Sequence, residues 1–252
     1  ILPFDAWSMV SVGALAILMT LLTLFLLIID LDRPDRFFFL LLRPQWRSWV
    51  ARAAWILSGF SAISGGWWAI ETLSWMFGFG VPEPLRMALA VLTIPFALMA
   101  AIYTAFLFAQ AEGRDLWQAT HVPVQMTLHA IVFGAAPFAF AGPVADVARV
   151  VFIVALIASA LLTLVADLGI PQSSEIARRA GHMMTRGAYR HHYWWGGLAL
   201  AHAVPLAMAA LAAFSVGPIT AIAGVATIVV LALGHYLYNV AFVMAPQEIP
   251  NI

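Results

Sequence analysis

Long apolar stretches alternate along this chain with short connections that carry arginine. Between charged residues, the stretches run over Ala6–Ile29, Ala53–Ile70, Met87–Ala111, Val122–Ala145, Val150–Ala166 and from Tyr193 onward. The last stretch is too long for one membrane crossing, and the turn-forming sequence Ser215-Val216-Gly217-Pro218 divides it into two. A helix that crosses a hydrocarbon layer of about 30 Å needs about 20 residues. The pattern therefore predicts seven transmembrane helices.

The composition agrees with a membrane protein. Hydrophobic residues make up 63% of the 252 residues and charged residues 10%, whereas about 25% of a soluble domain is charged. Backbone groups inside lipid must be hydrogen-bonded within the protein, so only helices or closed barrels span it. The apolar runs are continuous and do not alternate, which excludes a barrel. We expect an all-α, polytopic transmembrane helical bundle, with residues 1–252 forming a single membrane domain.

The distribution of arginine predicts an orientation. All 12 basic residues are arginine, and with seven crossings the first, third and fifth connections share one side of the membrane. That side holds ten of them: Arg33, Arg36, Arg43, Arg47, Arg52, Arg114, Arg178, Arg179, Arg186 and Arg190. The opposite side holds Arg86 and Arg149. The positive-inside rule makes the side with ten arginines cytoplasmic, so the N-terminus faces outward and the C-terminus inward.

The absence of cysteine limits the cofactors that this chain can bind. The sequence has no cysteine, so this chain ligates no iron–sulfur cluster, and any such cluster belongs to a partner. The first stretch has no basic segment before it and no cleavage site, so it is not a typical signal peptide, and we expect a further helix upstream.

Four histidines lie in or beside the connections: His121, His182, His191 and His192. Their spacing matches no recognised set of metal ligands, and we predict no metal site.

The acidic residue deepest in the outer half of the membrane is Glu71, which is flanked by Trp67 and Trp68. A carboxylate among indole rings is poorly solvated, so it could exchange protons near neutral pH. Alternatively, it is an interfacial glutamate paired with Arg86 or Arg149. Both interpretations stay open from the sequence.

Three histidines lie inside the predicted membrane segments. His129 and His235 fall at similar depth on different helices, and His202 lies nearer the midplane. Two neutral imidazoles so placed could ligate a b-type haem, or they could hydrogen-bond quinone carbonyls and relay protons. Alternatively, each histidine only bonds a neighbouring helix.

Three motifs lie in the first half of the chain. They are Asp30-Leu31-Asp32-Arg33-Pro34-Asp35-Arg36-Phe37, then Pro44-Gln45-Trp46-Arg47-Ser48-Trp49 with Trp55-Ile56-Leu57-Ser58-Gly59-Phe60, and Tyr103-Thr104-Ala105-Phe106-Leu107 with Gly113-Arg114-Asp115-Leu116-Trp117. Together they resemble the polysulfide reductase membrane-subunit (NrfD-like) family over the first four helices. That family usually has eight helices, so the resemblance implies that its first helix is missing here. Asp32 replaces the family's loop glycine.

The resemblance implies a quinone-reactive anchor subunit in the bacterial inner membrane, without a catalytic centre of its own. It would pass electrons between menaquinone or ubiquinone and an iron–sulfur subunit, which is joined to a molybdopterin catalytic subunit. Membrane lipid is the other expected partner, and we expect no binding to nucleic acid. The alternatives are a haem-b-binding anchor that uses His129 and His235, and a passive or ion-translocating anchor.

The predicted site residues follow from the polar residues inside the membrane segments and from the family resemblance. Tyr103 matches the family tyrosine, and its alternative is a packed aromatic. The predicted quinone-binding set is Tyr103, His129, His202, Glu71, Trp67 and Trp68. The predicted proton-transfer set is Glu71, His129 and His235.

Overall fold

The computed structural model describes residues 6–29, 31, 33, 37–140, 142–214 and 217–250, and every regular element in these ranges is helical. Within these ranges, five helices are long and apolar enough to cross a membrane: Met9–Ile29, Glu83–Phe108, Ala145–Gly169, His192–Ala212 and Ile219–Gln247. The prediction of an all-α, multi-pass membrane protein is thus confirmed. Residues 30, 32 and 34–36 of the first motif, and residues 215–216 of the predicted split, lie outside the described ranges.

The two other predicted crossings are also helical. Helix α3 (Trp49–Phe77) is continuous over 29 residues, but serine, glycine and Arg52 interrupt its apolar sequence. Helix α5 (Val122–Ala135) continues through the short 3-10 helix η3 (Ala136–Phe138) and forms a shorter apolar segment. Because α3 includes both Arg52 and Glu71, charged residues mark the ends of the crossings less well than the sequence analysis assumed.

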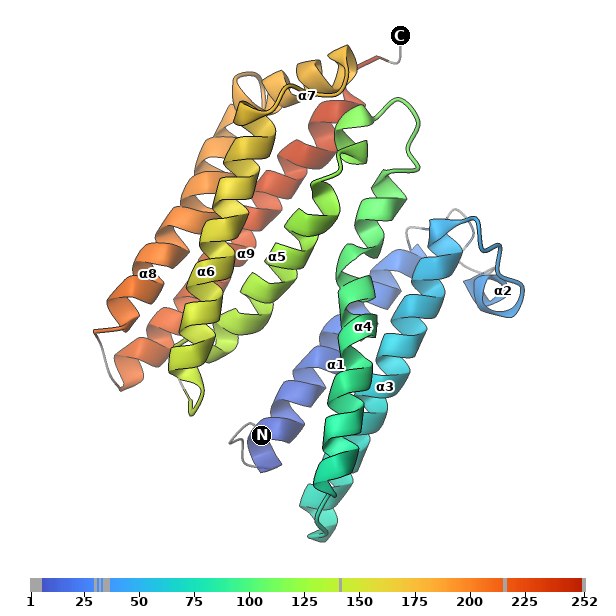
Figure 1. Cartoon of the computed structure of the whole chain (residues 1–252), viewed down its shortest axis with the longest axis vertical. Coiled ribbons are helices and arrows are strands. Elements are labelled where there is room, and N and C mark those ends of the chain that lie inside the picture. The colour runs from blue at the N-terminus through green and yellow to red at the C-terminus, as the bar shows by residue number, and fades with distance from the viewer. Residues whose placement is uncertain are drawn as a thin grey trace. The chain divides into compact units, whose positions relative to one another are not determined.

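The chain groups into two compact units, Ile1–Leu107 and Phe108–Ile252. In the first unit, α1 (Ala6–Ile29) and the short α2 (Phe37–Leu42) pack against α3 (Figure 1). Helix α4 (Glu83–Phe108) approaches α3 where the Phe96 ring meets Gly59, so closely that a Cβ there would lie 2.4 Å from Phe96 Cε1. Gly59 thus leaves the space that the Phe96 ring of α4 occupies against α3.

The second unit contains the remaining helices. Helix α6 (Ala145–Leu164) continues into the π-helix η4 (Val165–Gly169), and the π-helix η5 (His192–Ala203) continues into α8 (Val204–Ala212). Helix α9 (Pro218–Gln247) packs along η5 and α8, and α7 (Glu175–Thr185) lies across one end of these helices (Figure 1).

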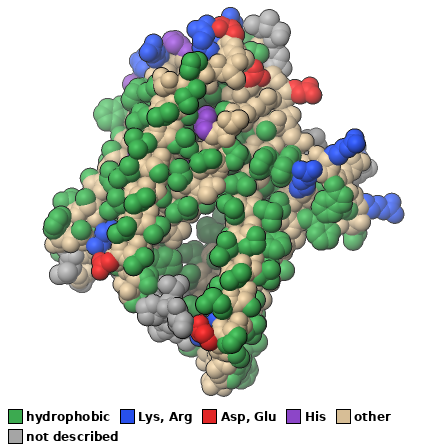
Figure 2. Space-filling view, viewed as in Figure 1, with side chains coloured by type: hydrophobic (Ala, Val, Ile, Leu, Met, Phe, Trp, Pro, Cys, Tyr) green, Lys and Arg blue, Asp and Glu red, His purple; other side chains and the backbone are tan. Residues whose placement is uncertain are grey.

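Apolar side chains cover the outer faces of these helices, as Figure 2 shows for one face of the molecule. On α9 the exposed positions recur every three or four residues: Ile219, Ile222, Val225, Val229 and Leu233. A stripe with this period marks one face of a helix. In lipid such a face needs no protein partner, so the packing of the second unit leaves it free for acyl chains.

Glycines bring η5 and α9 together without intervening side chains. A Cβ on Gly234 of α9 would lie 2.3 Å from the Ala201 backbone nitrogen, and one on Gly196 of η5 would lie 2.4 Å from Leu237 Cβ. Such contacts are possible only without side chains at these positions. His202 and His235 each directly follow one of the residues in the Gly234–Ala201 contact. The close approach therefore sets the separation of the two imidazoles.

The third sequence motif has a structural role at the end of α9. Pro246 has no N–H, so the carbonyl of Phe242 lacks its usual donor in the helix. The indole nitrogen of Trp117 donates to that carbonyl at 2.9 Å. Arg114 Nη1 donates to the carbonyls of Pro246 and Ile249 at 2.7 Å and 2.8 Å. The short 3-10 helix η2 (Asp115–Gln118) and the residue before it thus satisfy the carbonyls at this helix end.

We predict that Gly234→Ala destabilises the chain, because the added methyl group overlaps the backbone of η5. Overpacking of this kind lowers the free energy of unfolding by about 1–3 kcal/mol. Unfolding in mixed detergent micelles measures the loss. Gly134→Ala on α5 is the matched control, since its Cβ meets nothing within 4 Å, and equal stability of the two variants would contradict the close approach.

Candidate functional site

The predicted site residues fall into two groups, one in each unit. His129, His202 and His235 lie in the second unit and come from α5, η5 and α9. Tyr103, Glu71, Trp67 and Trp68 lie in the first unit, on α3 and α4.

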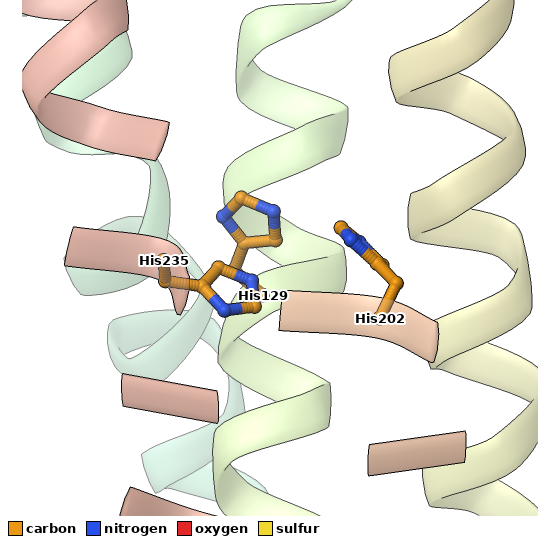
Figure 3. Close-up of side chains that lie close together, drawn as sticks. All are labelled: His129, His202 and His235. Atoms are coloured by element: carbon orange, nitrogen blue, oxygen red, sulfur yellow. The ribbon is translucent and has the colours of Figure 1, made fainter. Parts of the chain in front are cut away.

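The three histidines converge within the second unit (Figure 3). The ring centroids of His129 and His235 are 4.4 Å apart and nearly perpendicular, and those of His202 and His235 are 5.6 Å apart. One ring nitrogen from each residue lies within 4.8 Å of the others. His202 and His235 are buried, with 6% and 4% of their surface exposed. The sequence placed each histidine in the membrane, and the fold brings all three into one cluster.

Backbone carbonyls fix two of the rings. His202 Nδ1 lies 2.6 Å from the Gly197 carbonyl, and His235 Nδ1 lies 2.9 Å from the Leu231 carbonyl. A carbonyl only accepts hydrogen bonds, so Nδ1 must carry the proton in each ring. In the neutral imidazole the Nε2 atom is then an acceptor. Both residues therefore present an Nε2 lone pair to their surroundings.

A buried polar network joins the cluster to α6. Gln125, one turn before His129 on α5, places its Nε2 atom 2.8 Å from His129 Nε2, 3.0 Å from Ser159 Oγ and 2.9 Å from Thr163 Oγ1. Ser159 Oγ lies 2.9 Å from His202 Nε2. His129 and His202 are thus connected through amide and hydroxyl groups inside an apolar helix bundle, and His235 lies against both of them through ring contacts.

Two acceptors in this network lack a partner among the described side chains and backbone. They are His235 Nε2 and Gln125 Oε1, and both are buried. A buried polar atom without a hydrogen bond costs about 1–3 kcal/mol. A molecule with donors at two separate positions would satisfy both atoms.

Polar side chains continue from α6 into η4 beyond this network. Asp167 follows Thr163 by four residues, on the π-helix η4, and its Oδ2 atom accepts from Tyr238 Oη at 3.4 Å. The ring of Tyr193, which is fully buried, lies 6.1 Å from that of Tyr238. Ser159 and Thr163 on α6 and Asp167 on η4 therefore follow one another from the histidines toward the arginine-rich connection.

These three residues were not among the predicted site residues. Ser159 and Thr163 passed as ordinary residues of an apolar helix, and Asp167 passed as its end. Their four-residue spacing is the signal that could have found them, because residues at i and i+4 share a helix face. Its significance depends on the tertiary structure, which turns that face toward the histidines.

Glu71 forms an ion pair in the first unit. Arg86 donates from Nε and Nη2 to its two carboxylate oxygens at 2.7 Å and 2.8 Å, and Trp67 Nε1 donates at 3.2 Å. The glutamate side chain is 4% exposed and that of Arg86 is 35% exposed. Of the two expected partners, the structure shows Arg86. Arg149 instead contacts Asp146 at 3.4 Å and the Ala139 carbonyl at 3.0 Å.

The other residues of the first group contribute to packing. Trp68 Nε1 donates to the Val10 carbonyl at 3.0 Å, which ties α3 to α1. Tyr103 is buried against Ala53 and Leu57 in an apolar cluster between α3 and α4. Both side chains are thus held by neighbouring helices.

The comparisons add a family. Residues 4–245 match the family model described as "Polysulphide reductase, NrfD". No curated protein matches the chain. The family match extends over both units, whereas the three sequence motifs covered only the first four predicted helices.

We predict that Arg86→Gln strongly destabilises the chain, because it leaves the Glu71 carboxylate buried without its partner. Breaking a buried ion pair in this way costs about 3–5 kcal/mol. The unfolding midpoint in mixed micelles reports the loss, and Glu71→Gln in the same chain should restore part of it. Arg178→Gln breaks an exposed pair with Glu175 and should have no measurable effect. The same small effect in both variants would contradict the buried pair.

Proposed function

Because the chain belongs to the polysulphide reductase NrfD family, we propose that it is the quinone-reactive membrane anchor of a molybdenum- and iron–sulfur-containing respiratory oxidoreductase. It passes electrons between membrane quinone and a cluster-bearing partner subunit, which is joined to a molybdopterin catalytic subunit. The absence of cysteine supports this division, since the clusters must then belong to the partner.

The histidine cluster is the quinone site in this proposal. The observation that carries it is the pair of buried acceptors without partners, His235 Nε2 and Gln125 Oε1, beside His129 and His202. A quinol has a hydroxyl donor at each end of its ring, and it would give both acceptors the hydrogen bonds that they lack. The carbonyls of the oxidised form only accept hydrogen bonds, and His235 can donate to one of them after its Nε2 atom has taken up a proton.

The same residues account for the protons. Oxidation of a quinol releases two electrons to the partner's cluster and two protons to the protein. The His235 ring is placed to accept one of these protons, because its Nδ1 donates to the Leu231 carbonyl and its Nε2 lone pair is free, and His129 lies beside it. Ser159, Thr163 and Asp167 then offer a path along α6 toward the connection that follows η4. Reduction of quinone uses the same path in reverse.

The first unit offers the other predicted contacts, Glu71, Trp67, Trp68 and Tyr103, as a second place for quinone. The carboxylate of Glu71 already accepts from Arg86 and Trp67, and Trp68 already donates to Val10. A quinone or a transferable proton would have to displace these bonds. The histidine cluster has unpartnered acceptors and supports the function better.

A haem held by His129 and His235 fits the geometry poorly. Axial nitrogens on opposite sides of an iron, each about 2 Å away as in other metal–imidazole bonds, are about 4 Å apart, and their ring centres lie further apart still. The two ring centroids here are only 4.4 Å apart, and the rings are nearly perpendicular. A macrocycle cannot pass between them. A passive anchor, for its part, has no use for a buried polar network.

We propose a location in the bacterial inner membrane, with the arginine-rich connections on the cytoplasmic side and the N-terminus outside. Support comes from the ten arginines that the sequence places in the first, third and fifth connections. Helix α7 carries Arg178 and Arg179 among exposed positions at one end of the second unit, and Figure 2 shows basic side chains gathered there.

We predict that His129→Ala lowers quinol-linked turnover of the complex at least tenfold, because loss of a general acid–base group typically costs a factor of 10² or more. Turnover with a soluble dye that reduces the partner directly should not change. His182→Ala, on the exposed surface of α7, is the control. Unchanged quinone kinetics in His129→Ala and in His202→Ala would rule out the cluster as the quinone site.

We also predict that Asp167→Asn slows quinol-linked turnover several-fold while the KM for quinol stays the same, because it interrupts the proton path and leaves the quinone contacts in place. A larger solvent deuterium isotope effect on turnover should accompany the change. Asp146→Asn is the matched control, since the Asp146 side chain is 96% exposed. If KM rises and the isotope effect does not, Asp167 is not on the path.

A further inference from the structure

We propose that His129, His202 and His235 together bind one divalent transition-metal ion of the zinc class. One ligand nitrogen from each lies within 4.8 Å of the others. The three residues come from three helices, α5, η5 and α9 (Figure 3). No spacing in the sequence reveals such a set, which explains why the sequence analysis predicted no metal site.

The required movement is small. Zinc binds imidazole nitrogen at about 2.0–2.1 Å, which places tetrahedral ligands about 3.3 Å apart. Nitrogens that lie within 4.8 Å of one another reach this spacing with shifts of roughly 1 Å, within the range of side-chain rotation. The 4.4 Å and 5.6 Å centroid separations exclude a macrocycle between the rings, and a small outward rotation of the His129 or His235 ring would admit a single ion.

The surroundings of two rings match those of metal ligands. A histidine that binds a metal usually donates its other ring N–H to a carbonyl or carboxylate, which fixes the tautomer. His202 and His235 do this through Nδ1, to Gly197 and Leu231. His235 Nε2 is buried and has no partner. An ion would give it one, while His129 and His202 would exchange hydrogen bonds from Gln125 and Ser159 for metal bonds.

The ligand set also selects the class of ion. Imidazole suits zinc, copper, nickel and iron, whereas magnesium and calcium prefer oxygen. Three histidines leave one tetrahedral position for water, and the unpartnered Gln125 Oε1 could accept a hydrogen bond from it.

The metal site and the quinone site share ligands but stand on separate tests. An ion bound by the three histidines would occupy His235 Nε2, which we propose as a contact of quinol, so only one of the two can bind at a time. If both proposals hold, Zn²⁺ lowers quinol-linked turnover. If Zn²⁺ binds the cluster but does not affect turnover, the quinone assignment fails and the metal site stands.

Cobalt is the probe for the metal site, because tetrahedral Co²⁺ absorbs visible light and replaces zinc. The full chain in lipid nanodiscs is titrated with Co²⁺, and we expect one equivalent to give tetrahedral absorption bands that Zn²⁺ abolishes. His235→Ala and, independently, His202→Ala should each weaken binding at least tenfold. His182→Ala should bind Co²⁺ like the unaltered chain.

Circular dichroism of each variant shows that the helices have formed before metal binding is compared. Bands of unaltered intensity and affinity in both His235→Ala and His202→Ala would place the ion elsewhere and overturn the proposal. So would a folded, unaltered chain that gives no tetrahedral bands at millimolar Co²⁺.

Discussion

The arrangement of the second unit depends on how closely η5 and α9 approach each other. In lipid, helices gain no hydrophobic energy from associating, so close packing and hydrogen bonds hold them together. A Cβ on Gly234 would overlap the η5 backbone at Ala201, and one on Gly196 or Gly197 would overlap the α9 side chains of Leu237 or Tyr238. This contact brings His202 and His235 together beneath the α5 residue His129. The π-helical turns of η5 are of the kind often found at functional sites. The glycines thus act on the site without belonging to it.

Burying polar groups inside a membrane is unfavourable, and such groups are therefore informative about function. In the first unit the deepest acidic group, Glu71, is neutralised by Arg86 and held by Trp67, an arrangement that joins α3 to α4. In the second unit no described ion pair reaches the histidines, and neutral hydroxyl, amide and imidazole groups form the network instead. A neutral network can exchange protons without separating a salt bridge. This difference between the two units is the physical reason to place quinone chemistry at the histidines.

The sequence predicted the fold well because a chain of this kind crosses lipid in apolar helical segments of about 20 residues. The lengths of the apolar stretches predicted seven crossings, and each of these is helical in the described residues. Proline and glycine in the sequence located the break between α8 and α9. The ends of α3 were wrong by several residues, since Arg52 and Glu71 both lie inside it. For the site, the sequence named the three histidines and Glu71 but could not bring the histidines together. The hydroxyls of Ser159 and Thr163 gain importance only from the direction in which α6 faces, which depends on packing between helices distant in sequence.

The place where quinone binds is the central claim, and photolabelling tests it most directly. A quinone analogue with an azide on its ring would be bound to the complex in its native membrane, cross-linked by light, and located by mass spectrometry of peptides. The account predicts label on peptides that contain His129, His202 or His235, and protection of them by excess natural quinone. Label confined to peptides with Trp67, Glu71 or Tyr103, with the same protection, would contradict it and would move the quinone site to the first unit.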